Sequence, residues 1–569
     1  MPSSERRDPD QIRAVEAKEA AIAVLAGPGS GKTRTLANRA HYLLTKHSNG
    51  SIRLLTFTNK AAAEMKERAL RVPGQSSKRL AAGTFHTFGL EVLQNHGKQV
   101  GLNTEFEIID VDEQKALCQQ AGLDEDNLFS WSYVRLRGLK ATAGLLSFGK
   151  AYQAEKLKKN LVDFDDLIVY TADLLEQNAP LAKAYGLKHP HLLVDEFQDT
   201  SPAQFRIVTA LFPHIKTIGV FADDDQAIFE FAGAEAKNVK RFIQQLAAKE
   251  LPLYTNYRCA EKIVTLANRL ISSNPRSSGR LMKPYRKGGR IQYLHFNTPQ
   301  EEAEWVSGEI DQAIRNGATA KDFAVLVRGA PRAAFIVKAL DNLSLPLGRW
   351  FGSRYPSPAR KAIEICLSVS RGKLTDRQAA RLCDFLQIPD PAERVTAKLL
   401  PLISHPGIAP LRAISQMVWK GARPTDLLAE ARVCIETVDK SLIPGFDQIA
   451  LSVHGIQSRD VDFNLDNLLA ELALGGVAGS PTDEDSIKIS TIHRAKGLQW
   501  PTVYLVGLEE GVLPDFRADK DEEKLQEETR ACFVGICRAE DDLIITSVVH
   551  WATWSRQPSR FLRELGLIG

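Results

Sequence analysis

The sequence predicts an α/β fold built on parallel β-sheets, and two segments lead to that prediction. In the first, an apolar run at residues 20–25 leads into a glycine-rich loop, 26–33, and then into a predicted helix that extends to Lys46. Strand, loop and helix in this order are typical of a phosphate-binding α/β unit. In the second, the apolar run 192–194 ends abruptly in two adjacent carboxylates, as expected where a parallel strand reaches a site at its carboxyl end.

A second sheet is predicted near the C-terminus, where three short runs are apolar and β-branched: Ile487–Ile492, Val503–Val506 and Leu543–Thr546. The chain has 569 residues, too many for a single hydrophobic core, so several domains are expected. The net charge is only +4. A bulk polycation is therefore excluded, and any nucleic-acid site must come from local patches.

Neither export nor a membrane location is predicted. Residues 1–7 are polar and charged, without the apolar core of a signal peptide, and no uninterrupted apolar run is long enough to span a bilayer. The seven cysteines include no Cys-x-x-Cys pair, which disfavours a zinc or iron–sulfur site and suits a reducing compartment. We therefore expect a cytoplasmic protein without a membrane partner.

The loop at 26–33 has the composition that phosphate binding demands. Backbone N–H groups must point at phosphate oxygens, glycines let the chain come close, and the N-terminal dipole of the following helix favours an anion. Lys32 would reach the terminal phosphates and the Thr33 hydroxyl would ligate Mg²⁺. A chance glycine-rich turn before Lys-Thr is the alternative. The predicted nucleotide-binding residues here are Ala26, which replaces the usual first glycine, Gly27, Pro28, Gly29, Ser30, Gly31, Lys32 and Thr33.

The acidic end of the second segment complements this loop. Asp195 would hold Mg²⁺, directly or through water, and Glu196 would orient and deprotonate an attacking water. A solvated acidic turn is the alternative. Asp199 fits that alternative, or the role of a structural partner, better than Asp195 and Glu196 do. Together the two segments predict a nucleoside triphosphate hydrolase that uses ATP and Mg²⁺.

Further motifs follow in a fixed order along the chain. They are Gln11, the stretch 54–65 (Leu-Leu-Thr-Phe-Thr-Asn-Lys-Ala-Ala-Ala-Glu-Met), Gly83-Thr84-Phe85-His86, Asp223-Asp224-Asp225-Gln226, Asn256-Tyr257-Arg258, the stretch 491–498 (Thr-Ile-His-Arg-Ala-Lys-Gly-Leu), Glu527-Glu528-Thr529-Arg530 and the stretch 534–539 (Val-Gly-Ile-Cys-Arg-Ala). This ordered set resembles the UvrD/Rep/PcrA group of superfamily I DNA helicases, from about Gln11 to Phe561.

The resemblance implies two RecA-like α/β domains of the P-loop NTPase class, with ATP in the cleft between them and an inserted, mainly helical subdomain in each. The expected boundaries are 1–95 and 186–252 for the first domain, 96–185 for its insert, 253–368 and 480–569 for the second domain, and 369–479 for its insert.

The resemblance also assigns residues around the nucleotide base. Gln11 would read adenine, because an amide can donate and accept a hydrogen bond at once, although a surface glutamine is the alternative. Arg34 and Tyr257 would sandwich the base, since a guanidinium plane and an aromatic ring both suit a π face.

Three more residues would act at the γ-phosphate. Arg258 and Arg538 would reach it from the second domain and stabilise charge in the transition state, although Arg538 could instead form a surface salt bridge. Gln226 would sense the γ-phosphate from the end of the run 217–222. Of the three acids at 223–225, some must face solvent or pair with arginine.

Contacts to DNA are implied on one face. Single strands are bound by aromatic stacking and backbone contacts, and the residues that match the family's DNA-binding positions are Phe57, Thr58, Asn59, His86, Phe229, Phe231, Thr491 and His493. Core packing is the alternative for Phe229, and a polar loop for Thr491 and His493.

Two sites in the chain, one of them a residue pair, depart from the family pattern. Phe231-Ala232 stands where relatives usually have Trp-Arg, so a cation is lost, and Gln499 stands where they usually have Glu. Two basic clusters lie elsewhere, and a solvated loop describes them better than a phosphate track. They are Arg280, Lys283, Arg286, Lys287 and Arg290, and Arg135, Arg137 and Lys140.

Two functions are therefore carried forward. The first is a motor that moves 3′→5′ on single-stranded DNA, acts at single-strand/duplex junctions and unwinds duplex, with the direction implied by the resemblance alone. The second is an ATP-gated DNA-binding or regulatory subunit of a repair or anti-phage complex, partnered by a nuclease or a repair or defence protein. The departures at 231–232 and 499 favour the second, and the intact catalytic set favours the first. An RNA substrate stays open.

Overall fold

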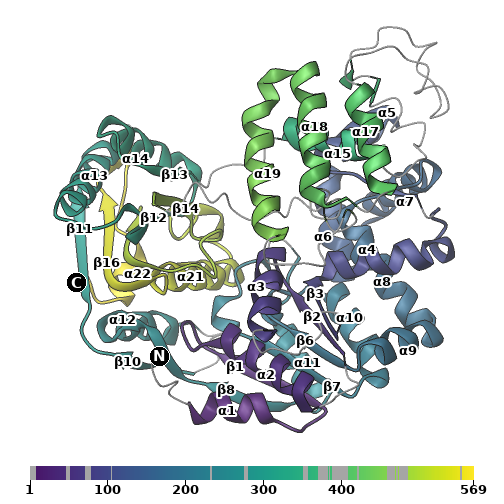
Figure 1. Cartoon of the computed structure of the whole chain (residues 1–569). Helices are drawn as coiled ribbons and strands as arrows, with labels where there is room; N and C mark the ends of the chain where they lie inside the picture. Colours follow the sequence, from purple (N-terminus) through teal and green to yellow (C-terminus); the bar gives the residue numbers. More distant parts are fainter. Residues whose placement is uncertain are drawn as a thin grey trace.

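The computed structural model describes residues 8–46, 51–70, 79–103, 105–230, 233–274, 280–349, 357–368, 382–383, 385–386, 408–419, 422–457, 465, 468, 472, 485–551 and 554–569. Two α/β bodies face each other across a seam, and a group of helices, α15 to α19, stands above the first body (Figure 1).

The first sheet has six strands in the order β3-β2-β6-β7-β1-β8, and every neighbouring pair is parallel. Its strands are β1 (Ala21–Ala26), β2 (Ile52–Thr56), β3 (Leu80–Thr84), β6 (His191–Val194), β7 (Thr217–Ala222) and β8 (Lys249–Leu253). The strand predicted at 20–25 is β1, and the strand that ends at Asp195 is β6. Both are fully buried, as central strands of a parallel sheet covered on two faces must be.

Helices cover both faces of this sheet. Alternate residues of β1 enter different cores, because successive side chains of a strand point to opposite faces: Ala21, Ala23 and Leu25 belong to one cluster, and Ile22 and Val24 to the other. The helices of this body are α1 (Pro9–Glu16), α2 (Lys32–Lys46), α3 (Asn59–Ala69), α4 (Phe85–His96), α8 (Phe164–Gln177), α9 (Ala179–Lys188), α10 (Pro202–Leu211) and α11 (Lys237–Gln245).

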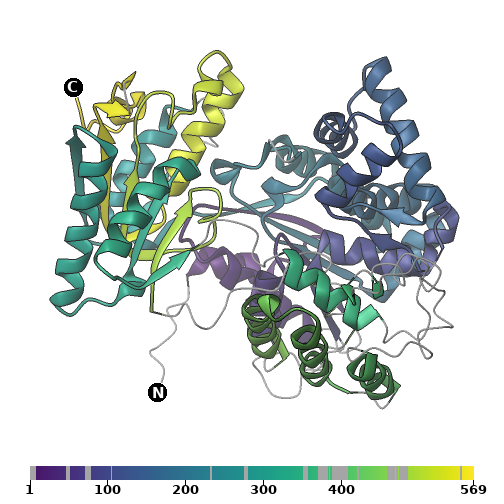
Figure 2. The same ribbon diagram turned by 90° about the horizontal axis from the view of Figure 1, so that it is seen from above.

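The second sheet repeats this architecture in the order β11-β16-β15-β12-β14-β13, again entirely parallel. Its strands are β11 (Arg290–Phe296), β12 (Phe323–Val327), β13 (Leu347–Arg349), β14 (Ile487–Thr491), β15 (Trp500–Val506) and β16 (Ala539–Val548), and its helices are α12 (Glu261–Ser272), α13 (Pro299–Arg315), α14 (Ala330–Asn342), α21 (Glu522–Ile536) and α22 (Arg560–Glu564). The three C-terminal strands predicted from sequence are β14, β15 and β16. Figure 2 shows the two bodies side by side.

Each sheet carries an inserted helical unit, which confirms the predicted fold class. Between β3 and β6, the helices α5 (Val111–Gln120), α6 (Asn127–Arg137) and α7 (Ala143–Lys158) join the short strands β4 (Glu107–Ile108) and β5 (Leu161–Val162). Between β13 and β14 come α15 (Ser357–Ser368), α17 (Ile408–Trp419), α18 (Pro424–Val438) and α19 (Ile443–Gln457), which share a core of their own. The domain boundaries given above stay predictions.

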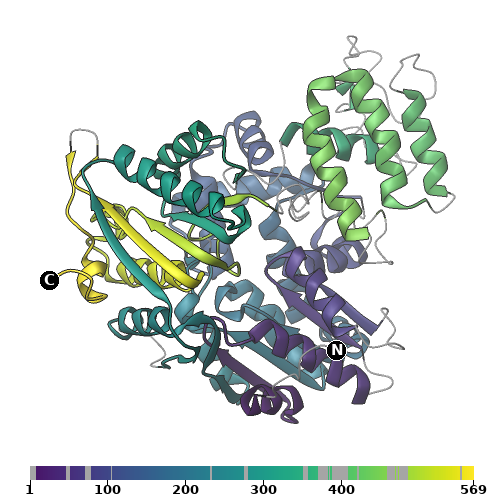
Figure 3. The same cartoon turned by 60° about the vertical axis from the view of Figure 1, so that its left-hand side comes forward.

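The second insert lies over the first body rather than over its own sheet (Figure 3). Arg360 on α15 is 3.1 Å from the Asp110 carboxylate at the start of α5, and the Lys361 ammonium is 3.2 Å from the same carboxylate. In the described part of the chain, no helix is both long enough and apolar enough to cross a membrane.

Candidate nucleotide site and nucleic-acid interface

The glycine-rich loop is held in shape from both sides. Gly29 and Gly31 have φ angles of +68° and +81°, which favour glycine. The Gln11 side-chain amide donates to the Ser30 carbonyl at 2.9 Å. On the other side, the Asn256 amide donates to the Pro28 carbonyl at 2.8 Å. The loop therefore sits between α1 and the strand β9 (Thr255–Ala260), which leads into the second body.

Residues predicted to surround the base lie around this loop. Tyr257 donates its backbone N–H to the Gly29 carbonyl at 2.9 Å and its hydroxyl to Asp8 at 2.6 Å. Gln11 is nearly buried at 8% exposure, so it is not a surface glutamine. Arg34 is exposed on the first turn of α2. The sandwich of a base by Arg34 and Tyr257 stays a prediction.

Lys32 and Glu196 form an ion pair at the centre of the site. The Lys32 ammonium lies 2.6 Å from Glu196 and 3.8 Å from Asp195. Burial alone would lower the pKa of Lys32, but the charges of Glu196 and Asp195 outweigh it and raise that pKa. Burial would raise the pKa of Glu196, yet Lys32 and Lys496 lower it to about 2. Both groups are therefore charged and neutralise each other.

The two acids after β6 differ in backbone geometry and in the direction of their pKa shifts. Glu196 has a φ of 49°, a left-handed conformation that costs a side-chain-bearing residue energy and is common at functional sites. Burial, together with the nearby Glu196 charge, raises the pKa of Asp195 to about 6 although Lys32 opposes it. The Asp195 Oδ1 atom is buried without a hydrogen-bond partner.

Asp195 and Thr33 fit a magnesium ion. Mg²⁺ prefers oxygen ligands, and it is usually held by one or two carboxylates together with phosphates and water. Asp195 Oδ1, which has no hydrogen-bond partner, would supply one such oxygen, and Thr33 in the first turn of α2 would supply a hydroxyl. In the described ranges no group of three or more His, Cys, Asp or Glu side chains is arranged to hold a metal ion.

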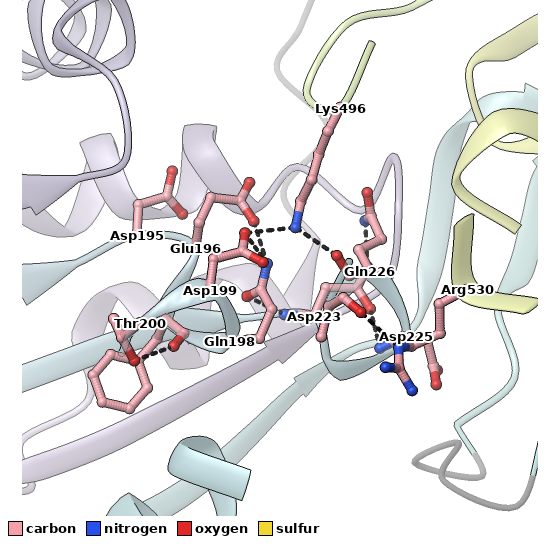
Figure 4. Close-up of polar contacts among 12 residues, drawn as sticks. Asp195, Glu196, Gln198, Asp199, Thr200, Asp223, Asp225, Gln226, Lys496 and Arg530 are labelled. Carbon is pink, nitrogen blue, oxygen red and sulfur yellow. Dashed lines mark hydrogen bonds and ion pairs between the residues drawn. The ribbon is translucent and has the colours of Figure 1, made fainter. Parts of the chain in front are cut away.

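A hydrogen-bond network connects the strand ends of β6 and β7 (Figure 4). Gln198 donates to the Glu196 carboxylate at 2.6 Å and to the Asp199 carboxylate at 3.2 Å, and it accepts from the Asp223 backbone at 2.9 Å. Gln226 in turn donates to the Asp223 carboxylate. Asp199 is 5% exposed, so it is a structural partner rather than a solvated acid. The sequence analysis gave Gln198 no role, although it lies in the same acidic motif.

Two arginines approach this network from the second body. Arg538 donates to the Gln226 side-chain oxygen at 2.9 Å and to the backbone carbonyls of Val534 and Leu498. Arg258 donates to the Cys537 carbonyl at 3.4 Å, and its Nε is buried without a hydrogen-bond partner. Burial, and then the Arg258 charge, lower the pKa of Arg538 to about 10.

Arg538 is buried and Arg258 is partly buried, and two like charges near each other in such a place are unfavourable unless an anion joins them. Arg538 is 1% exposed, so a surface salt bridge does not describe it. The geometry suits a phosphate group that would bind between the loop and the two arginines.

Lys496 crosses the seam and was not predicted as a site residue. Its ammonium, carried by the segment after β14, donates to Asp199 at 2.5 Å and to the Gln226 carbonyl. The same ammonium lies 5.3 Å from the centroid of the Phe229 ring, within the range of a cation–π contact. Its position within the stretch 491–498 was the available sequence signal. Lys496 thus touches both the nucleotide-site network and an aromatic group.

The aromatic group draws three predicted DNA-contacting residues together. Phe57 and Phe229 are stacked, with ring centroids 5.2 Å apart and planes at 21°, and the edge of His493 meets Phe229 at 6.2 Å. Phe57 is 49% exposed, while Phe229 packs partly against the core of the second body. One side of the Phe229 ring is therefore packed in the core. Its stack with the exposed Phe57 ring is a platform suited to a nucleobase.

The other predicted DNA contacts have different local roles. Thr58 accepts from the Ala61 N–H at 3.2 Å and caps α3. Thr491 accepts from the Arg494 N–H at 3.4 Å. Burial lowers the pKa of His86 to about 4 and, with Arg328 and Lys496, that of His493 to about 4. Phe231 and Ala232 lie outside the described residues, as does the side chain of Asn59.

Both basic clusters are largely paired with acids. In the first cluster, Arg280 pairs with Glu250 at 2.9 Å, Lys287 pairs with Glu261 at 2.9 Å, and Arg286 pairs with Asp541. In the second, Arg135 pairs with Asp166 at 2.8 Å and Arg137 with Glu235. These pairs agree with the interpretation that neither cluster is a dedicated phosphate track.

Comparison with known proteins gives a consistent result. A family model described as the UvrD/REP helicase N-terminal domain matches residues 7–131 and 137–247, and one described as the UvrD-like helicase C-terminal domain matches 251–350 and 439–550. Proteins named ATP-dependent DNA helicase PcrA from Staphylococcus aureus and Staphylococcus epidermidis are each 28% identical to this chain, over 98% of its length and 86% of theirs.

Proposed function

The chain belongs to the UvrD/Rep-type family of DNA helicases, and from that premise we propose that it is an ATP-driven motor that moves 3′→5′ on single-stranded DNA and separates duplex ahead of it. The observation that carries the proposal is that groups suited to ATP hydrolysis come from both bodies. Lys32 and Glu196 lie on the first body, and Arg258 and Arg538 approach from the second.

ATP binding would change the state of Glu196. In the ion pair with Lys32, a carboxylate with a pKa of about 2 is a weak base. When Lys32 exchanges this carboxylate for phosphate oxygens, Glu196 loses its main neutralising partner and its pKa rises, which makes it a better base for water. Glu196 would then accept the proton of the attacking water, while Gln198 keeps the carboxylate oriented through its 2.6 Å hydrogen bond.

The remaining groups would position Mg²⁺ and stabilise the transition state. Asp195 and Thr33 would hold Mg²⁺, which supplies charge neutralisation at the phosphates. Arg258 and Arg538 would stabilise charge that develops on the γ-phosphate, a contribution that can reach about 10³–10⁵ in rate. Because both arginines come from the second body, hydrolysis would depend on closure of the seam. That dependence would couple the reaction to domain motion.

The DNA would lie where the aromatic group reaches the surface. The proposed contacts are Phe57, Thr58, Asn59, His86, Phe229, Phe231, Thr491 and His493. Lys496 supports this placement, because it reaches across the seam from the second body and contacts both Asp199 and the Phe229 ring. Single-stranded DNA and junctions are the proposed partners, and a nuclease or repair protein is a further candidate. All seven cysteines are buried free thiols, which suits the proposed cytoplasmic location.

A strand-separation assay tests the proposal. Duplexes with a 3′ overhang, a 5′ overhang or blunt ends are mixed with the protein, ATP and Mg²⁺, and Lys32→Ala serves as the control. Separation of the 3′-tailed duplex alone is the expected result. Separation of the 5′-tailed duplex would contradict the direction. DNA-stimulated hydrolysis without any separation would favour the second candidate, an ATP-gated subunit, to which the departures at 231–232 and 499 point.

A further inference from the structure

The segment that carries Phe229 is gripped from the second body. Arg530 on α21 donates its Nε to the Ala227 carbonyl at 2.6 Å, and its Nη2 lies 3.3 Å from the Glu230 carboxylate. The Glu230 backbone N–H donates to the Glu527 carboxylate at 3.2 Å. Arg530 is 3% exposed and lies beside Asp225 (Figure 4). Residues 227–230 are therefore held against α21 of the opposite body.

The continuation of this segment is held by the first body and its insert. Arg137, the last residue of α6, donates to the Ala234 carbonyl at 3.1 Å and pairs with the Glu235 carboxylate. The Glu235 N–H donates to the Thr200 carbonyl at 3.0 Å. The two ends of the segment are thus attached to different bodies, with Phe229 beside the Arg530 contacts.

We propose that the Glu230–Arg530 pair is a positioning device that ties the orientation of the Phe229 ring to closure of the two bodies. The inference rests on the proposed function and deepens it, because it names the contact by which the nucleotide state would reach the DNA platform.

Separation of the two bodies would disturb the Glu230–Arg530 pair. Arg530 is almost fully buried, and a buried guanidinium that loses its partner pays a large desolvation penalty. Opening the seam must therefore either pull residues 227–230 along with α21 or break this pair. In the first case the Phe229 ring leaves its 5.2 Å stack on Phe57. Either outcome makes the DNA platform sensitive to the position of the second body.

The test is a double-mutant cycle with Glu230→Gln, Arg530→Gln and the double variant. Two readouts are taken in the full-length protein: the ratio of ATP turnover with and without poly(dT), and the change in fluorescent oligo(dT) affinity when a non-hydrolysable ATP analogue is added. Glu230→Gln is expected to lower the stimulation ratio about tenfold, while basal turnover and KM for ATP stay unchanged. In the double variant, the effects of the two substitutions on this ratio should not add, as is usual for residues in contact. Glu523→Lys on the exposed side of α21 is the matched surface control.

The outcomes separate this inference from the function on which it rests. If the unaltered protein is stimulated by poly(dT) and Glu230→Gln is stimulated equally, the positioning role is wrong and the motor stands. If the effects of the two substitutions simply add, the pair does not act as a unit and the inference fails. If the unaltered protein shows no stimulation, both proposals fail. Thermal unfolding of each variant distinguishes a loss of folding from a loss of coupling. Because Glu230 is only partly buried, we expect Glu230→Gln to stay folded.

Discussion

Lys32 and Glu196 restrain each other through a 2.6 Å ion pair. The pair explains how two charged groups are tolerated in a buried place, since each supplies the counter-charge of the other. It also means that one contact restrains both the lysine that would bind phosphate and the carboxylate that would activate water. Two substitutions separate these roles.

Replacing Glu196 by Gln should leave ATP bound but uncleaved. The amide keeps the size of the side chain but cannot accept the proton of water, so kcat should fall by about 10²–10⁴. Equilibrium binding of a fluorescent ATP analogue, measured beside steady-state turnover, checks both halves of the prediction. Unchanged turnover in this variant would remove Glu196 from the role of base.

Replacing Lys32 by Ala should abolish hydrolysis and weaken nucleotide binding. The variant loses the ammonium that would bind the terminal phosphates and leaves the neighbouring carboxylates without their counter-charge, so we expect turnover to fall about 10²-fold or more. The same two measurements apply. An enzyme that retained turnover without Lys32 would contradict the assignment of the loop.

At the scale of elements, the glycine-rich loop depends on its neighbour β9. A Cβ atom added at Gly29 would lie 2.6 Å from the Arg258 Cβ and 2.7 Å from the Asn256 side-chain oxygen. The loop is therefore packed directly against the strand that carries one of the two arginines. This close approach connects a local sequence requirement, glycine at a positive φ, to the arrangement of the two bodies.

Gly29→Ala should raise the KM for ATP by about tenfold, because displacement of the loop and backbone strain of order 1–3 kcal/mol act together at the site. Gly122→Ala is the matched control, since Gly122 has a φ of +66° and no atom within 4 Å of the added Cβ. ATP titrations of both variants test the difference. If both variants bind ATP like the unaltered protein, the contact with β9 does not shape the site.

The sequence predicted the elements around the loop well and the contacts between bodies poorly. Local signals sufficed for β1, β6, β14, β15 and β16, because apolar runs bounded by glycine or acid are readable within a short window. The contacts of Lys496 and Arg530 were not predicted, because their partners, Asp199 and Glu230, lie about 300 residues away in the chain. No periodicity encodes such a pairing, and only the folded arrangement of two sheets reveals it.

At the scale of the whole molecule, we propose that the seam between the bodies is the functional unit. Lys496, Arg530 and Arg538 all cross it, and each contacts the stretch that runs from Gln226 to Glu230. That stretch begins at the nucleotide network and ends beside the Phe57–Phe229 stack. We therefore propose that ATP hydrolysis and single-stranded DNA binding are linked through this one short segment. Linkage of this kind must act in both directions at equilibrium.

The most direct test of that claim is steady-state ATP hydrolysis by the unaltered protein, measured with and without single-stranded DNA. We expect strong stimulation by the DNA and loss of most of that stimulation in Phe57→Ala, with basal hydrolysis present in both proteins. Equal turnover with and without DNA would contradict the linkage. In that case the DNA-facing assignments from Phe57 to His493 should be withdrawn, while the ATP site could still stand.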